Sequence, residues 1–198
     1  MKTRFAASAA VALTALLALV GCAGTTSGGD MEGMDHGGTS SSAPASADAN
    51  DADIMFASMM QEHHAQAIEM SDMLLSKDGV DERIVALAEE IKAAQQPEIQ
   101  KMEQWLEDWG ADTSDMEGMD HGDGMMSEDE MQALDDATGA DAGKLFLEQM
   151  IQHHEGAVGM AQEEVDNGQN SEAIALAQTI IDAQTTEIAT MEEILATL

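Results

Sequence analysis

The chain is poor in cysteine, in basic side chains and in aromatic rings. It has one cysteine and no tyrosine, and its 7 Lys and Arg residues face 39 Asp and Glu residues, which gives a formal net charge of −32. A single cysteine excludes a disulfide framework and any zinc site built from several cysteines. The scarcity of basic residues excludes nucleic acid and anionic membrane surfaces as electrostatic partners. So much carboxylate favours cations instead, either metal ions or a basic protein patch.

The first 21 residues have the pattern of a bacterial lipoprotein signal peptide. Lys2 and Arg4 precede an apolar run over residues 5–20, and a Leu-Val-Gly-Cys sequence ends at Cys22. The apolar run is too short for a comfortable membrane span. We therefore expect residues 1–21 to be removed and Cys22 to carry a lipid, which would anchor the protein to the bacterial cell membrane outside the cytoplasm. An ordinary signal peptide with an incidental cysteine is the alternative, and it gives the same compartment.

Residues 22–50 are predicted to form a disordered N-terminal tether. They are mostly Gly, Ser, Thr, Ala and Asp. Such a segment buries too little apolar surface to offset the entropy lost on ordering. As a flexible coil it would reach about 30 Å from the membrane.

Beyond residue 50 the apolar residues recur with helical spacing, and no stretch alternates with period two, so we expect helices and no strands. A first long helix should end before Gly79, and a second should run from about 81 to 109, with a kink at Pro97 and an end at Gly110. A capping box that begins at Ser127 predicts a short helix to about residue 137. Two further helices are predicted over about 141–168 and from about 171 to the C-terminus.

An internal repeat organises these helices. Residues 60–70 align with residues 150–160 at an offset of 90, and a Gln-x-x-Glu-Ile segment at 95–99 recurs at 184–188. Two hairpins of common origin, 51–110 and 141–198, should therefore pack as an all-α four-helix bundle over 51–198. The link between them, 111–140, is expected to be long and partly disordered.

A second repeat places methionine in polar surroundings. Residues 30–37 recur unchanged as residues 115–122, and both copies lie among Gly, Ser and Asp, where a methionine has no core to fill. Thioether sulfur is soft and selects Cu(I), and it cannot be consumed by disulfide formation in an oxidising compartment. The candidate ligands in these segments are Met31, Met34, His36, Met116, Met119, His121, Met125 and Met126.

The helices supply a further set of candidate ligands. At 100° per residue, Met59, Met60 and Met70 share the core-facing side of the first helix with His63, whereas His64 falls on its flank. Equivalent positions recur in the second hairpin. The candidates are Met59, Met60, His63, His64, Met70, Met150, His153, His154 and Met160. The alternative is that these methionines are core packing and these histidines are hydrogen-bonded structural residues.

The paired segments also carry a family resemblance. The Phe56-x-x-x-Met60-x-x-His63-His64 pattern, with its counterpart at 146–154, resembles the paired signature of the bacterial DUF305 family, which includes copper-binding proteins of the CopM type. The resemblance covers residues 51–198. It implies a ferritin-like four-helix bundle outside the cytoplasm and copper binding through Met and His. The Met-Asp-His segments of the tether and the link are not part of that signature.

The sequence thus predicts a membrane-anchored, extracytoplasmic protein that is not an enzyme and that sequesters or hands on copper, chiefly Cu(I). A copper donor or acceptor protein and a second copy of the chain are the protein partners that this role admits. Two alternatives stay open: a cuprous oxidase, and a metal-free helical interaction module with an acidic surface. A ferritin-like di-iron enzyme is excluded because no Glu lies three residues before a His. A His-Glu-x-x-His zinc site is absent too.

Overall fold

A computed structural model describes residues 48–111 and 124–198, and every secondary-structure element within them is an α-helix. The helices are α1 (Asp51–Leu75), α2 (Glu82–Trp109), α3 (Glu128–Asp136), α4 (Gly139–Asn167) and α5 (Ser171–Leu195). The all-α prediction and the order of the helices are confirmed. The signal peptide, Cys22, and the candidate ligands Met31, Met34, His36, Met116, Met119 and His121 lie outside the described residues.

The helix ends follow from capping chemistry. Asn50 and Asp53 form a capping box at the start of α1, and Ser127 and Glu130 form the predicted one at the start of α3. Gly110 ends α2 with a positive φ of 63°, a conformation that favours glycine. α2 continues through Pro97 as one uninterrupted helix.

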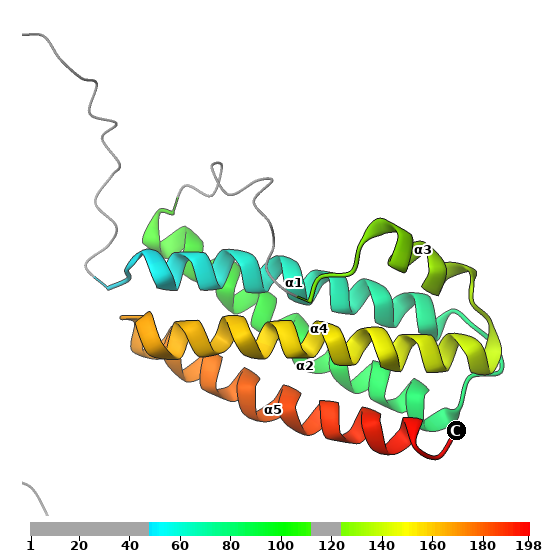
Figure 1. The fold of residues 1–198 in the computed structure, drawn as a ribbon. Helices are drawn as coiled ribbons and strands as arrows, with labels where there is room; N and C mark the ends of the chain where they lie inside the picture. The colour runs from blue at the N-terminus through cyan, green and yellow to red at the C-terminus, as the bar shows by residue number, and fades with distance from the viewer. Residues whose placement is uncertain (1–47, 112–123) are drawn as a thin grey trace, which may run out of the picture. The chain divides into compact units, whose positions relative to one another are not determined.

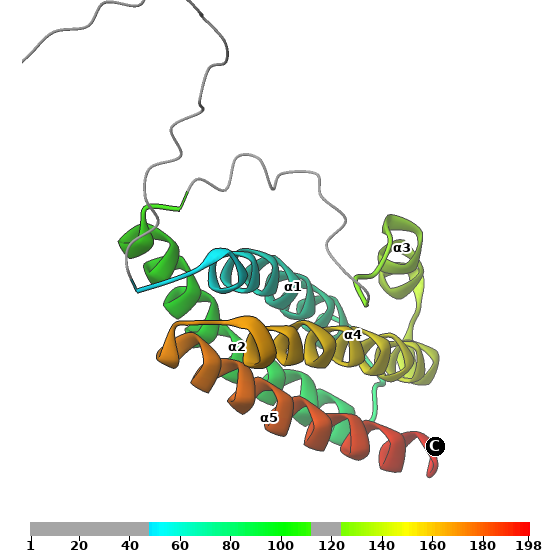
Figure 2. The same ribbon diagram turned by 60° about the vertical axis from the view of Figure 1, so that its left-hand side comes forward.

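Two hairpins build the bundle, as the repeat predicts. α1 packs on α2 and α4 packs on α5, while α1 and α4 join the hairpins and run in opposite directions (Figure 1). The short α3 lies against α1 and α4 near one end of their contact, as Figure 2 also shows. We call this the covered end, and the end formed by the start of α1 and the close of α4 the open end. The ferritin-like character that the resemblance implies stays a prediction.

The interior has two separate apolar clusters, one toward each end. The cluster at the covered end includes Met70, Leu74, Leu134 and Met150, whereas the cluster at the open end includes Phe56, Met60, Ala157 and Met102. Within residues 48–111 and 124–198, no helix combines the length and the apolar run that a membrane span requires.

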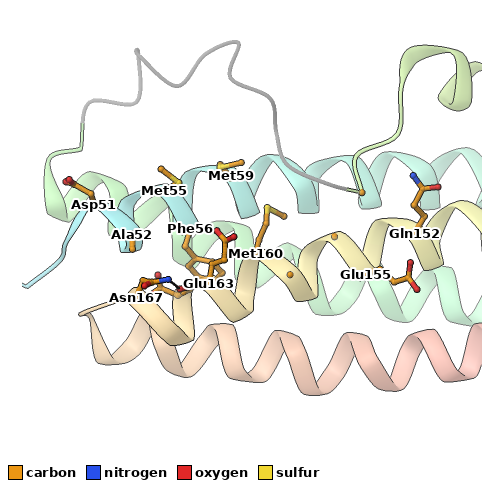
Figure 3. Close-up of a pocket in the computed structure, with 14 residues that line it drawn as sticks. Asp51, Ala52, Met55, Phe56, Met59, Gln152, Glu155, Met160, Glu163 and Asn167 are labelled. Atoms are coloured by element: carbon orange, nitrogen blue, oxygen red, sulfur yellow. Dashed lines mark hydrogen bonds between the residues drawn. The ribbon is translucent and has the colours of Figure 1, made fainter.

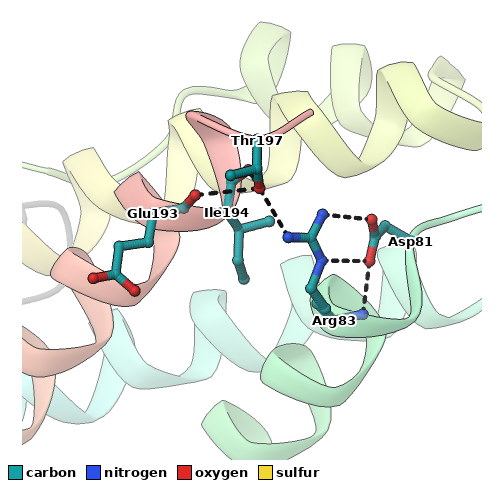
Figure 4. A network of polar contacts seen from close by, with 5 residues as sticks. All are labelled: Asp81, Arg83, Glu193, Ile194 and Thr197. Atoms are coloured by element: carbon teal, nitrogen blue, oxygen red, sulfur yellow. Dashed lines mark hydrogen bonds and ion pairs between the residues drawn. The ribbon is translucent and has the colours of Figure 1, made fainter.

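A polar network ties the start of α2 to the last turn of α5 (Figure 4). Arg83 donates from Nε and Nη2 to the two carboxylate oxygens of Asp81, at 3.0 and 2.8 Å, and from Nη1 to the Thr197 hydroxyl at 2.8 Å. These side-chain hydrogen bonds from Arg83 lower the pKa of Asp81 to about 2. The C-terminus is thereby fastened to the first hairpin.

Candidate metal centre

The repeat brings two histidines together in the middle of the bundle. His63 on α1 and His153 on α4 are fully buried, and their ring centroids lie 3.7 Å apart with a tilt of 40° between the planes. Both histidines face inward, as the sequence predicted. Neither ring nitrogen of either residue has a hydrogen-bond partner among the described residues.

Burial keeps this central pair neutral. Desolvation, followed by the nearby His64 and His154, lowers the pKa of His63 from 6.5 to about 3. The pKa of His153 is lowered well below its ordinary value by burial and by His63. A neutral imidazole offers a nitrogen lone pair, which is the form that binds a metal ion. Two neutral rings side by side therefore present donor atoms without first having to lose a proton at neutral pH.

The outer histidines have a different environment. His64 Nε2 lies 2.8 Å from Glu98 Oε2, and His154 Nε2 lies 2.7 Å from Glu187 Oε2. The sequence placed His64 on the flank of its helix, and the structure shows that a neighbouring helix covers this flank, so both outer histidines are fully buried. Each carboxylate is about one-fifth exposed and connects its histidine to the bundle surface.

Further polar groups extend this layer across the bundle. Gln95 on α2 and Gln184 on α5 are both buried, and the side-chain oxygen of each has no hydrogen-bond partner among the described residues. Unpaired buried polar atoms cost about 1–3 kcal/mol each, and native structures keep few of them. We call the four histidines with Gln95, Gln184, Glu98 and Glu187 the histidine belt. It separates the two apolar clusters.

Soft donors stand on both sides of the belt. Met60 lies one helical turn before His63, and Met150 lies one turn before His153; both are fully buried, each in a different apolar cluster. In the part of the chain that the structure describes, no three His, Cys, Asp or Glu side chains are grouped so as to hold a metal ion. An ion bound at the belt would therefore depend on imidazole and thioether together. This donor set suits Cu(I) and Ag(I) better than it suits Zn(II) or Mg(II).

The remaining predicted ligands are distributed over the bundle. Met70 is fully buried in the apolar cluster of the covered end, while Met59 and Met160 line a groove at the open end (Figure 3). Met126 is buried beneath α3, and Met125 is half-buried. The described candidates therefore do not converge on one site.

Sequence reasoning missed the groups that partner the outer histidines. It aligned Gln95 and Glu98 with Gln184 and Glu187 but gave these residues no role. The sequence did contain a signal for these contacts. A polar Gln-x-x-Glu segment recurs on the second helix of each hairpin, and that helix packs against the first helix, which carries the two histidines. Glu98 and Glu187 are the residues that such reasoning would have added.

Comparisons with known proteins identify the family and support the helical fold. The model of the family described as a domain of unknown function, DUF305, matches residues 53–195. The solved structure of a putative secreted DUF305 protein from Streptomyces coelicolor is 32% identical, with a TM-score of 0.68, and the match covers 74% of this chain and 93% of that one. A DUF305 fragment from Deinococcus radiodurans is 31% identical, with a TM-score of 0.65 and coverages of 76% and 99%.

A further similar structure is that of CopM in its Cu(II)-bound form. It is 34% identical, with a TM-score of 0.63, and the match covers 73% of this chain and 96% of that one. CopM is also similar in its Cu(I)-bound, silver-soaked and apo forms. No curated protein matches the chain. With a family model over most of its length and relatives above 30% identity, this chain belongs to the DUF305 family.

Proposed function

We propose that this protein binds copper, chiefly as Cu(I), and that it sequesters the ion or hands it on rather than transforming a substrate. The observation that carries the proposal is the His63–His153 pair: four buried ring nitrogens without hydrogen-bond partners among the described residues. Met60 and Met150 flank this pair with thioethers. The similarity to CopM, a protein with copper-bound and silver-bound structures, supports the choice of ion.

The outer histidines would hold the belt in place. Each forms a hydrogen bond through Nε2 with a carboxyl group on the neighbouring helix, His64 with Glu98 and His154 with Glu187. Such contacts fix the helix that carries the adjacent inner histidine. Because the inner rings are neutral and already buried, little reorganisation is needed when an ion enters.

The proposal extends to the location of the protein. The lipoprotein pattern that ends at Cys22 supports an extracytoplasmic, membrane-anchored protein, and one similar structure is that of a putative secreted protein. Mass spectrometry of the N-terminal peptide after membrane extraction tests the anchor. A lipid on Cys22, and release of the Cys22→Ser variant into the soluble fraction, are the expected results.

The test of ion choice is competition against a chromophoric Cu(I) chelator with the chain from residue 23 onward, under anaerobic conditions. We expect Cu(I) and Ag(I) to bind far more tightly than Zn(II) or Mg(II) at neutral pH. Equal competition by Zn(II) for the same sites would refute the soft-metal assignment. Absence of any binding would favour the metal-free interaction module. In a separate aerobic assay, sustained oxygen consumption with added Cu(I) would favour a cuprous oxidase.

A further inference from the structure

The open end of the α1–α4 contact has a groove of about 950 Å³. Met55 and Met59 enter it from α1, and Met160 rises from α4 toward the same side (Figure 3). We propose that this groove is a second soft-metal site, distinct from the histidine belt, in which the thioethers of these three methionines bind Cu(I) or Ag(I). The choice of ion rests on the proposed function, while the location of the site rests on the groove alone.

Core packing does not account for the two methionines of α1, Met55 and Met59. Met55 is 45% exposed and Met59 is half-buried, and neither belongs to the apolar clusters of the bundle. Met160 is half-buried and packs against the cluster at the open end, so it joins the groove to the apolar interior. A single exposed apolar side chain is normal on a protein surface, so the informative observation is that three methionines line the same groove.

Two other half-buried methionines show the contrast. Met73 on α1 and Met131 on α3 line a smaller groove at the covered end, and Met126 lines it too. All three belong to, or pack against, the apolar cluster of that end. They hold α3 on the bundle, which is a structural role. Met73 and Met131 are therefore natural controls for the methionines of the open groove.

The charge of the groove favours cations. Asp51, Glu155 and Glu163 line it, and none of the described lining residues is Lys, Arg or His. Carboxylates raise the local concentration of any cation, and thioethers then select a soft monovalent ion among them. Gly156 and Gly159 on α4 also line the groove, and a Cβ on Gly159 would meet no atom within 4 Å, so space is available above the helix backbone.

The position of the groove suggests its role relative to the belt. Met59 lies one helical turn, about 6 Å along the axis, before His63. Met160 lies two turns beyond His153, and because α1 and α4 are antiparallel, both displacements lead to the open end. A solvent-facing thioether site next to a closed imidazole site is suited to receive an ion from solvent or from another protein.

The experiment is methionine-methyl NMR. The chain from residue 23 onward, labelled with 13C at the methionine methyl groups and kept in chloride-free buffer, is titrated with Ag(I), a redox-inert substitute for Cu(I). The methyl resonances of Met55, Met59 and Met160 are expected to shift together. The variant Met55→Leu, Met59→Leu, Met160→Leu should lose one equivalent of bound Ag(I), whereas the matched control Met73→Leu, Met131→Leu should retain it.

The outcomes separate this site from the proposed function. If only Met60 and Met150 shift, the belt binds metal and the groove proposal is refuted. If Met73 and Met131 shift as strongly as the three groove residues, binding to any accessible thioether replaces a specific site. If no described methionine responds, the groove proposal fails, and the competition assay with the Cu(I) chelator separately decides the proposed function. A shift confined to the groove upholds this inference and removes Met60 and Met150 from the proposed ligands.

Discussion

The two ends of the α1–α4 contact are equivalent by sequence repeat and differ in structure. Met70 at the covered end corresponds to Met160 at the open end, yet Met70 is fully buried and Met160 is only half-buried. The difference comes from α3, a segment without a counterpart in the repeat. Gln149 donates to the Glu130 carbonyl, and Gln66 makes two hydrogen bonds with the Met126 backbone, so α3 and the residues before it are fixed over one end only.

Two further equivalent positions differ in chemistry. Leu74 packs in the apolar cluster of the covered end, and its counterpart at the open end is Glu164, which is 1% exposed. Gly143, whose added Cβ would meet Ile84 at 2.8 Å, corresponds to Asp53. Duplication has thus kept the helices and the central histidines, while the ends have diverged into a packed end and an end with buried carboxyl groups.

The largest expected effect tests whether the covered end is structural. Met70→Ala should lower the free energy of unfolding of the apo protein by about 2–5 kcal/mol, because it leaves a cavity in a closed core. Met160→Ala at the equivalent open position should cost less than about 1 kcal/mol. Chemical denaturation of both variants measures the difference. Equal losses would show that α3 does not distinguish the two ends.

The next effect concerns the carboxyl pair of the open end. Burial, followed by the neighbouring Asp53, raises the pKa of Glu164 from 4.5 to about 8. Asp53 is itself held as an acceptor, because its carboxylate receives the backbone N–H groups of Asn50, Gln169 and Asn170. A proton on Glu164 would let it donate to Asp53, whereas an ionised Glu164 has no hydrogen-bond donor among the described residues.

The sign of the pH dependence follows from this shift. Between about pH 4.5 and 8 the unfolded chain releases the Glu164 proton while the folded chain retains it, so the folded state loses stability as pH rises. Glu164→Gln should remove this loss and raise the stability at pH 8 by about 1–3 kcal/mol relative to the parent, with little effect at pH 4. Thermal melting of both proteins from pH 4 to 9 measures it. Parallel pH profiles would contradict the raised pKa.

A smaller change in the free energy of unfolding is expected for substitutions of the central histidines, which lie between the two ends. The ring nitrogens of His63 and His153 have no hydrogen-bond partner among the described residues, so replacing these histidines leaves no other buried polar group unpaired. The double variant His63→Leu, His153→Leu should therefore leave the stability of the apo protein unchanged or raise it by about 1 kcal/mol. The affinity for Cu(I) should fall by about tenfold or more, equivalent to 1.4 kcal/mol. Because the repeat makes the two sites equivalent, the single variants should behave alike. Strong apo destabilisation with copper binding intact would make the pair purely architectural.

No change in stability is expected when the candidate ligands of the tether and the link are replaced. Replacing the tether and link ligands with Ser should lower the copper stoichiometry while helicity and melting stay unchanged. Metal titration and circular dichroism of the same variant measure both quantities. Unaltered stoichiometry would remove these segments from the proposed ligand set. The residues replaced are Met31, Met34, His36, Met116, Met119 and His121.

The sequence predicted those features that depend on local spacing. The capping box at Ser127, the stop at Gly110 and the inward faces of His63 and His153 each follow from a few neighbouring residues, and all are confirmed. The repeat alignment also predicted that two similar hairpins pair.

Features that depend on an unrepeated contact were beyond this reasoning. Nothing in the helical spacing of Met70 and Met160 shows that α3 covers one of them, because the position of α3 is fixed by side chains distant in sequence, such as Lys77, whose ammonium donates to the Asp135 carbonyl. The pairing of His64 with Glu98 likewise required knowing which face of α2 meets α1. The sequence therefore indicated which residue types form the candidate site, but it did not indicate which of these residues lie together in the fold.

The histidine belt has a consequence for how the bundle opens. Because it interrupts the apolar interior, the cluster on each side can loosen without breaking apolar contacts that cross the belt. Amide hydrogen exchange in the apo protein should then report two cooperative units along the bundle axis, each drawing on all four long helices. An ion that joins His63 to His153 would bridge the units, so that metal would slow exchange at both ends and merge two unfolding events into one.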